Sequence, residues 1–177
     1  MNKLLLLGMA TLALLAAAVT SFAQDAPVAP AWTSPGSAGA TIDGTSIQNY
    51  AVSPFPTNAC LTFKSTKAGK IVARYDVVNT AVPSTPVPPW TTFELGYIMP
   101  AGSTVTAVLY RVFPCTGQVV EICRIPTTTT TVPRCDVCQF ANSSFNYLTN
   151  LYMVEVTLSR PTTDVPAPSV CTLRVYN

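Results

Sequence analysis

The stretch KIVARYDVVN, residues 70–79, decides the fold class because apolar side chains recur at every second position. Ile71 to Val77 supply these apolar positions, whereas the opposite side of the chain carries Arg74 and Asp76. A period of two residues is typical of a β-strand that buries one face. The stretch therefore predicts a strand that covers a hydrophobic core.

Similar stretches recur along the chain and are separated by turn residues. Strands are predicted at residues 60–64, 70–79, 90–98, 103–113, 118–125, 151–159 and 170–176. Residues 127–131 are an extended loop or an edge strand, and only residues 142–150 favour a short helical turn. Short strands at this spacing predict an all-β fold, an antiparallel β-sandwich of about seven to nine strands. We expect Greek-key connections, Ig-like or jelly-roll-like, and reinforcement by disulfides.

The N-terminus has the features of an export signal. Lys3 precedes an apolar stretch over residues 4–19, and residues 21–23 (SFA) offer small side chains to a signal peptidase. We therefore expect a signal peptide, residues 1–23, that is removed after Ala23. Export predicts a secreted, periplasmic or cell-surface location. No second stretch is long and apolar enough for a transmembrane helix in the mature chain.

The mature chain is expected to contain an arm and one domain. Residues 24–40 are rich in Pro, Ala, Gly and Ser, which predicts a flexible arm that Trp32 anchors to the domain. Residues 41–177 have the length of a single β-sandwich domain. Because a β-sandwich has open sheet edges, residues 36–42 are also a candidate strand for the edge of a neighbouring copy.

The composition argues against several classes of function. The sequence has no histidine, 10% charged residues and a formal net charge of +2. Without histidine a Ser-His-Asp or Cys-His catalytic arrangement cannot form, and the basic residues are too sparse for a nucleic-acid surface. No loop carries the clustered oxygen ligands typical of calcium sites. We therefore expect no cofactor, no metal and no nucleic-acid partner.

Six cysteines in an exported domain predict disulfide bonds. A bridge between Cys60, which opens the first predicted strand, and Cys171, in the last, would tie the ends of the domain together. Sequence alone does not choose among the remaining pairings. We expect three bridges and no free thiol, the other four cysteines being Cys115, Cys123, Cys135 and Cys138.

Other interpretations of these cysteines are weaker. Residues 135–138 (CDVC) have the CxxC spacing of a redox site, but they follow a Thr- and Pro-rich segment and do not precede a helix. A c-type haem site would need histidine where Gln139 stands. The four cysteines of the cluster could also bind zinc, which requires thiolates that stay reduced after export. Structural disulfides are therefore preferred.

Aromatic residues on predicted strands are candidates for ligand binding. Their rings can stack on sugars, or they can fill the core and pair across strands, which is the commoner role. The candidate ligand-stacking residues are Trp90, Tyr97 and Tyr110.

Acidic residues on predicted strands leave one enzymatic mechanism open, acid–base catalysis by two carboxylates. The simpler interpretation is that each one faces solvent or pairs with an arginine. The residues concerned are Asp76, Glu94, Glu121 and Glu155.

The sequence thus favours an exported, non-enzymatic β-sandwich with a structural, adhesive or surface-assembly role. Its expected partners are itself, other cell-surface proteins or glycans. A carbohydrate-binding module is the first alternative, and a small carboxylate-dependent glycan hydrolase is the second.

Overall fold

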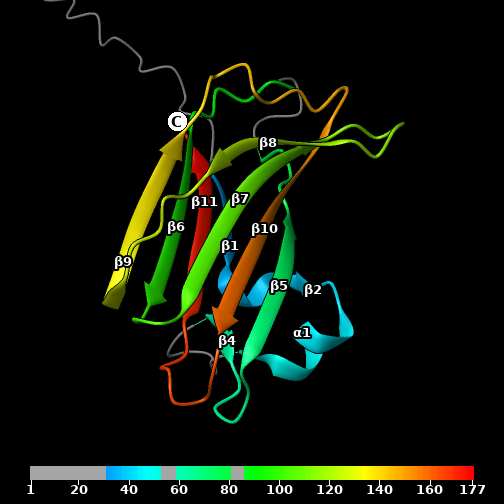
Figure 1. Ribbon diagram of the computed structural model, residues 1–177. Helices are drawn as coiled ribbons and strands as arrows, with labels where there is room; N and C mark the ends of the chain where they lie inside the picture. The colour runs from blue at the N-terminus through cyan, green and yellow to red at the C-terminus, as the bar shows by residue number, and fades with distance from the viewer. Residues whose placement is uncertain (1–30, 53–58, 81–85) are drawn as a thin grey trace, which may run out of the picture.

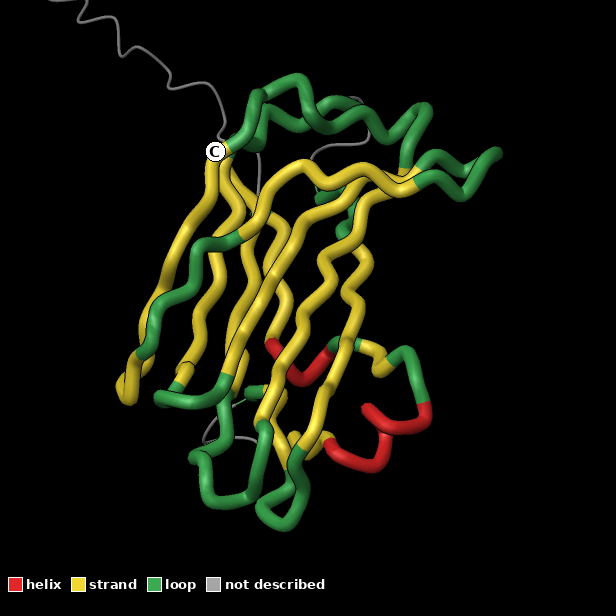
Figure 2. Tube along the Cα trace, in the orientation of Figure 1, coloured by secondary structure: helices red, strands yellow, loops and turns green. Residues whose placement is uncertain are grey.

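The computed structural model describes residues 31–52, 59–80 and 86–177, which form two antiparallel sheets packed face to face (Figure 1). The predicted all-β sandwich is confirmed, and Figure 2 shows how little helix accompanies the strands. Sheet A contains, in order, β3 (Tyr50–Val52), β4 (Leu61–Phe63), β11 (Ser169–Tyr176), β6 (Thr92–Met99) and β9 (Thr130–Gln139). β1 (Trp32–Pro35) also pairs with β11. In order across sheet B lie β2 (Ala40–Thr41), β5 (Gly69–Asp76), β10 (Leu151–Arg160), β7 (Thr104–Val112) and β8 (Val119–Arg124).

The strand pairs are nested along the chain. β4 pairs with β11, β5 with β10, β6 with β9, and β7 with β8, so that each pair encloses the next. This nesting is the topology of a jelly roll, one of the two connectivities expected from the sequence. The described residues contain eleven strands, more than the seven to nine expected. The short strands β1, β2 and β3 account for the excess, because two to four residues are too few to show a period.

The core lies between the sheets and is built from alternate residues of each strand. In β5, Ile71, Ala73 and Tyr75 are buried, as the alternation over residues 70–79 predicts. In β7 the buried, inward-facing series is Val105, Ala107 and Leu109. Burial of this many apolar side chains on both sheets is the main driving force for the fold.

The one α-helix in the described residues, α1 (Gly44–Asn49), lies beside β5 (Figure 1). It begins after Asp43, whose carboxylate accepts hydrogen bonds from the backbone N–H of Ser46 at 2.6 Å and from its hydroxyl at 2.9 Å. The Ser46 hydroxyl also accepts from the Val72 N–H at 2.9 Å, which fastens α1 to β5. The short helical turn expected within residues 142–150 is present as a single turn, in which the Asn150 N–H donates to the Asn146 carbonyl at 3.1 Å, and no longer helix forms there.

The predicted arm, residues 24–40, is wrong for residues 32–40. Trp32–Pro35 forms β1 on β11, a 3₁₀ turn follows as η1 (Gly36–Ala38), and β2 pairs with β5. Proline is tolerated at the end of β1 because this strand has a neighbour on one side only. Trp32 is 4% exposed, which confirms that it anchors the segment. The signal peptide and residues 24–30 lie outside the described residues.

The same pairing corrects the expected role of residues 36–42. They were a candidate strand for the sheet edge of a neighbouring copy, but Ala40 and Thr41 pair with Arg74 and Ala73 of the same chain. The hydrogen bonds of β1 are likewise made within the chain, to β11. The segment therefore completes its own fold, entering sheet A first and then sheet B.

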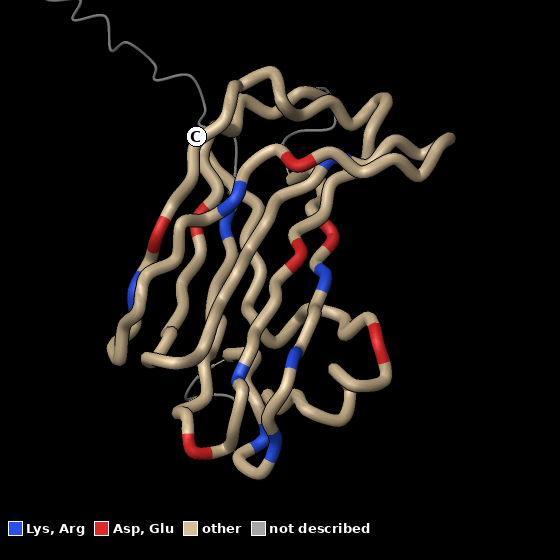
Figure 3. The backbone as a smooth tube through the Cα atoms, in the orientation of Figure 1, with Lys and Arg blue, Asp and Glu red and all other residues tan. Residues whose placement is uncertain are grey.

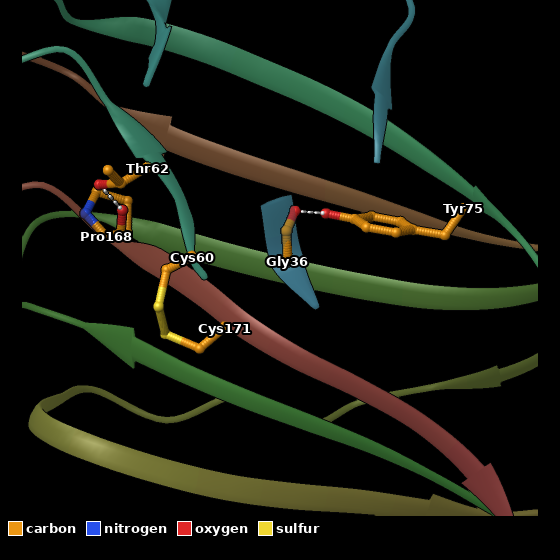
Figure 4. The surroundings of a disulfide bond; sticks show 6 residues. All are labelled: Gly36, Cys60, Thr62, Tyr75, Pro168 and Cys171. Carbon is orange, nitrogen blue, oxygen red and sulfur yellow. Dashed lines mark hydrogen bonds between the residues drawn. A yellow bond between two sulfur atoms is a disulfide. The ribbon is translucent and has the colours of Figure 1, made fainter. Parts of the chain in front are cut away.

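Two disulfides reinforce the described structure. Cys60–Cys171, the bridge expected from the sequence, joins the start of β4 to β11 (Figure 4). Cys123–Cys138 joins β8 to β9, and thus an edge of sheet B to an edge of sheet A.

The third expected bridge is absent from the described structure, since Cys115 and Cys135 are free and exposed. Cys115 lies in the turn between β7 and β8. Alternation along β9 turns Cys138 inward, opposite buried Phe93, and turns Cys135 to the outer face of sheet A, opposite Gly96. The two thiols therefore belong to different surfaces of the sandwich.

Gly36 allows the N-terminal segment to approach β11 closely. A Cβ at this position would lie 1.8 Å from the carbonyl oxygen of Val170, so only glycine fits. Its own carbonyl accepts a hydrogen bond at 2.5 Å from the buried hydroxyl of Tyr75 (Figure 4). Nearby, the Thr62 hydroxyl donates to the carbonyl of Pro168 at 2.9 Å. The close approach of Gly36 to β11 and its hydrogen bond from Tyr75 fix the segment that connects the two sheets.

Candidate functional site

Of the three aromatic residues predicted to stack on a ligand, only Tyr110 reaches the surface. Trp90 is fully buried and Tyr97 is 1% exposed, so neither ring can present a face to a ligand. Both predictions are therefore wrong. Tyr110 lies on the outer face of sheet B, between Met153 of β10 and Glu121 of β8.

Tyr97 serves the interior as a polar anchor. Its hydroxyl donates to the Asp136 carboxylate and accepts from the backbone N–H of Thr128 at 2.8 Å. Arg134 pairs with the other oxygen of Asp136 at 2.8 Å. Burial raises the pKa of Asp136, but the hydrogen bonds from Tyr97 and Arg134 outweigh it and hold the pKa below its usual value. Tyr97 thus fixes the connection between β8 and β9.

Trp90 belongs to a cluster of aromatic rings at one end of the core. Its indole meets the ring of Phe145 edge-on, with centroids 5.2 Å apart, and that of Tyr147 at 6.4 Å. Phe145 packs in turn against Tyr152 at 4.4 Å. Edge-to-face and tilted pairs of this kind stabilise a core beyond the area that they bury.

The outer face of sheet B around Tyr110 is the candidate site, which we name the Tyr110 face. It carries an aromatic ring among charged side chains on four neighbouring strands, and Figure 3 shows charged positions along these strands at the front of the molecule. The Tyr110 face comprises Arg74, Asp76, Val108, Tyr110, Glu121, Arg124, Met153 and Glu155.

Two arginine–carboxylate pairs hold the polar part of the Tyr110 face in place. Arg74 and Glu155 are directly opposite on β5 and β10 and approach to 2.9 Å. Arg124 and Glu121 pair along β8 at 2.6 Å, where a register shift beside Tyr110 brings them together. Each pair remains open to solvent, with side-chain exposures between 25% and 50%. The face therefore offers hydrogen-bond donors and acceptors at fixed positions.

Apolar residues and two pockets border the Tyr110 face. Along one side, Leu151, Val112 and Val119 lie in register on β10, β7 and β8, and Leu151 is 58% exposed. At the β5 end, Asp76 and Leu151 also line a pocket of about 370 Å³, together with Val77, Val78, Asn79, Tyr147 and Tyr152.

At the β8 end, Glu121 lines a second pocket of about 290 Å³. We name it the Arg111 pocket; it is lined by Arg111, Val120, Glu121, Ile122, Phe140, Ala141 and Ser144. A ligand that crossed sheet B through the row of Asp76, Met153, Tyr110 and Glu121 would run from one pocket to the other.

Three of the four predicted strand carboxylates pair with arginine and Asp76 is exposed, as the simpler interpretation of the sequence expects. Glu155 pairs with Arg74, Glu121 with Arg124, and Glu94 with Arg174 at 3.7 Å. Each of these three carboxylates is therefore held beside a guanidinium donor.

The cysteines offer neither a redox centre nor a zinc site. Cys138 is bonded to Cys123, which removes two thiolates from a four-cysteine zinc cluster and separates the CxxC pair. Burial raises the pKa of the Cys135 thiol, and the carboxylates of Glu94 and Asp136 raise it further, whereas redox-active thiols have a lowered pKa. Within the described ranges no group of three or more His, Cys, Asp or Glu side chains has the geometry of a metal site.

The sequence had named Tyr110 as a stacking residue and Asp76, Glu121 and Glu155 as candidate carboxylates, but it did not predict that they share one face. The alternation over residues 70–79 placed Arg74 and Asp76 on the side opposite the core. The same parity along residues 151–159 would have added Met153 and Glu155. What the sequence lacked was the register that places these side chains beside Tyr110.

No protein-family model matches the chain, and no curated protein matches its sequence. Among solved structures, a carbohydrate-binding module of the β-sandwich superfamily is similar, with a TM-score of 0.46 and 12% identity. The match covers 87% of this chain and 60% of that one, so this chain spans less than two thirds of that structure's length.

Two further solved structures are similar at a lower TM-score. The C-terminal family 22 carbohydrate-binding module of Clostridium thermocellum Xyn10B has a TM-score of 0.43 and 13% identity, over 81% of this chain and 85% of that one. The laminarinase of Rhodothermus marinus has a TM-score of 0.36 and 10% identity, over 82% and 96%. Likeness at this level carries no argument about function, which has to be argued from the surface. Within the described residues, no helix is long and apolar enough to cross a membrane.

Proposed function

We propose that this protein is a non-catalytic glycan-binding module and that the Tyr110 face binds a short oligosaccharide across β5, β10, β7 and β8. The observation that carries the proposal is the position of Tyr110 between Met153 and Glu121, with the Arg74–Glu155 and Arg124–Glu121 pairs alongside. A sugar ring presents an apolar face and a rim of hydroxyl groups. An aromatic ring and fixed charged groups satisfy both.

The proposed setting is outside the cytoplasm, as the predicted signal peptide requires. Two disulfides support it, because such bonds persist in oxidising compartments. Binding of a glycan there amounts to attachment to a surface, which is the adhesive role favoured by the composition.

The experiment is a glycan-array screen of the mature protein, followed by calorimetry with the best oligosaccharide. Tyr110→Ala should weaken binding at least tenfold, which corresponds to about 1.4 kcal/mol and is typical of an aromatic contact at the centre of a site. Tyr176→Ala is the matched control. Tyr176 is a second partly exposed tyrosine beside a carboxylate and an arginine, Glu94 and Arg174, but on the outer face of sheet A.

Unchanged binding in Tyr110→Ala, together with loss in Tyr176→Ala, would move the site to sheet A and refute the proposal. Release of reducing ends from the same glycan, abolished by Glu155→Gln, would show a hydrolase instead.

Self-assembly is the second candidate function, because exposed apolar side chains lie near the border of the Tyr110 face. Leu148 is 76% exposed and Val78 is 57% exposed, beside the already described Leu151. Light scattering of the wild type and of Leu148→Ser/Leu151→Ser at high concentration tests this. A dimer that becomes a monomer in the double variant supports assembly, and a monomeric wild type rejects it.

A further inference from the structure

Arg111 occupies a position that the β7 pattern reserves for core residues. It follows Val105, Ala107 and Leu109 in the inward-facing series, and it is in register with buried Tyr152 of β10. Placing a guanidinium on the inner side of a sheet is costly unless a partner compensates for the lost water.

The described residues supply Arg111 with no such partner. Its Nε is buried and has no hydrogen-bond partner. Its guanidinium lies over the ring of Phe113, with Cζ 5.0 Å from the ring centroid. The other arginines of the described structure pair with carboxylates or, in the case of Arg160, with backbone carbonyls. Arg111 is thus a cation without a counter-charge, and it lines the Arg111 pocket.

We infer that the Arg111 pocket binds the carboxylate of a uronic-acid residue. This inference rests on the proposed glycan-binding function and makes its ligand an acidic glycan. A guanidinium recognises a carboxylate through two parallel hydrogen bonds, which the two terminal Nη groups of Arg111 can donate from the pocket wall. Phe140, in the same lining, offers an apolar surface to the sugar ring.

The second charged group of the pocket does not oppose this ligand. Glu121 also lines the pocket, but Arg124 donates to both of its oxygens, from Nε at 3.2 Å and from Nη2 at 2.6 Å. The pair is neutral as a unit, so the charge that a ligand meets in the pocket is that of Arg111. Since Glu121 also stands beside Tyr110, a glycan on the Tyr110 face reaches the pocket without leaving sheet B.

A covalent bond holds the two walls of the pocket together. Ile122 of β8 adjoins Cys123, and Phe140 follows β9 two residues after Cys138, so the disulfide between these cysteines closes the sandwich edge beside the pocket. The Phe140 N–H donates to the carbonyl of Thr91 at 2.9 Å, which fixes the second wall to the chain before β6. The pocket is therefore formed before the ligand arrives.

The test uses small probes and a reporter at the residue itself. The Nε–Hε resonance of Arg111 in the mature protein is followed by NMR during titration with glucuronate, glucose and acetate. We expect glucuronate to shift this resonance in a saturable manner, acetate to bind at least tenfold more weakly, and glucose to have no effect. Because Arg111→Gln lacks this resonance, binding to the variants is measured by calorimetry: Arg111→Gln should show no glucuronate binding, whereas Arg174→Gln, on the outer face of sheet A, should bind glucuronate as the wild type does.

A resonance that does not respond to glucuronate overturns the inference, and so does equal binding of acetate, which would show that the pocket reads a carboxylate without its sugar. A separate outcome distinguishes this inference from the proposed function. If Tyr110→Ala loses binding of an oligosaccharide and Arg111→Gln does not, glycan binding by the Tyr110 face is supported and uronate binding by the Arg111 pocket is refuted.

Discussion

Removal of the two disulfides in turn should cost different amounts of stability, because they close loops of very different length. Cys60–Cys171 spans 111 residues and Cys123–Cys138 spans 15. In the chain-entropy model, the longer loop restricts the unfolded chain by about 4.8 kcal/mol and the shorter by about 3.0 kcal/mol. The expected difference between the two double variants is therefore about 1.8 kcal/mol.

The variants are Cys60→Ala/Cys171→Ala and Cys123→Ala/Cys138→Ala, and urea unfolding of each gives the free energy. Each bridge has one well-buried cysteine, Cys60 at 4% and Cys123 at 7% exposure, so the cost of the lost sulfur atoms is similar and cancels in the difference.

All proteins in this series carry serine at positions 115 and 135, because the two free thiols would otherwise exchange with the bridges. An equal loss in both double variants, or a larger loss on removal of Cys123–Cys138, would refute the entropic reasoning. It would mean that the local bond acts mainly on the folded state, by holding the sandwich edge closed.

Three other changes test the fold. Gly36→Ala should destabilise by about 2–4 kcal/mol in urea unfolding, because its Cβ would meet a backbone carbonyl at 1.8 Å, whereas Gly44→Ala, with nothing within 4 Å, should not destabilise. Arg160→Lys should lower the free energy of unfolding by about 2–4 kcal/mol, because the buried guanidinium donates to four backbone carbonyls that an ammonium cannot reach together. A decrease below about 0.5 kcal/mol would contradict this account. Asp136 has a lowered pKa in the folded protein, so its ionised form stabilises the fold above its ordinary pKa of 3.8 and this contribution is lost as the pH falls further. The stability advantage of the wild type over Asp136→Asn should therefore be constant above about pH 4 and shrink below it, and a thermal-unfolding difference that is independent of pH would reject this role.

How far the sequence predicts the fold depends on how clearly each strand alternates. Residues 70–79 and 151–159 contrast apolar and polar sides, and both are strands with the expected inward faces. β6 shows the same contrast, which the prediction of Tyr97 as a ligand-stacking residue left unused. The series of Phe93, Leu95 and Tyr97 is the apolar side, and the alternate side has Glu94 and Gly96, which would have assigned Tyr97 to the core.

The strands and site contacts that the sequence did not predict depend on contacts between distant parts of the chain. The sequence of β9 shows no alternation of apolar and polar residues, and it includes Pro133. It forms a strand because β6 provides a partner along one side. β1 exists because β11, at the other end of the sequence, offers an open edge. The candidate site depends on the same kind of contact, since Tyr110 and Glu155 come together only through the register of β7 on β10. Propensity and period carry no information about such pairings.

The pairing of β1 with β11 has a mechanical consequence. Trp32 is opposite Val175, so the described chain enters and leaves the sandwich at the same end, and tension applied there would unzip this pair one hydrogen bond at a time. Unzipping would stop at the covalent link between Cys60 and Cys171, which transmits the load directly across the molecule. All of the chain between those two cysteines, including the Tyr110 face, is then shielded from the pull. A protein that attaches to a surface through this face would unfold at its ends under load while the binding face stays folded.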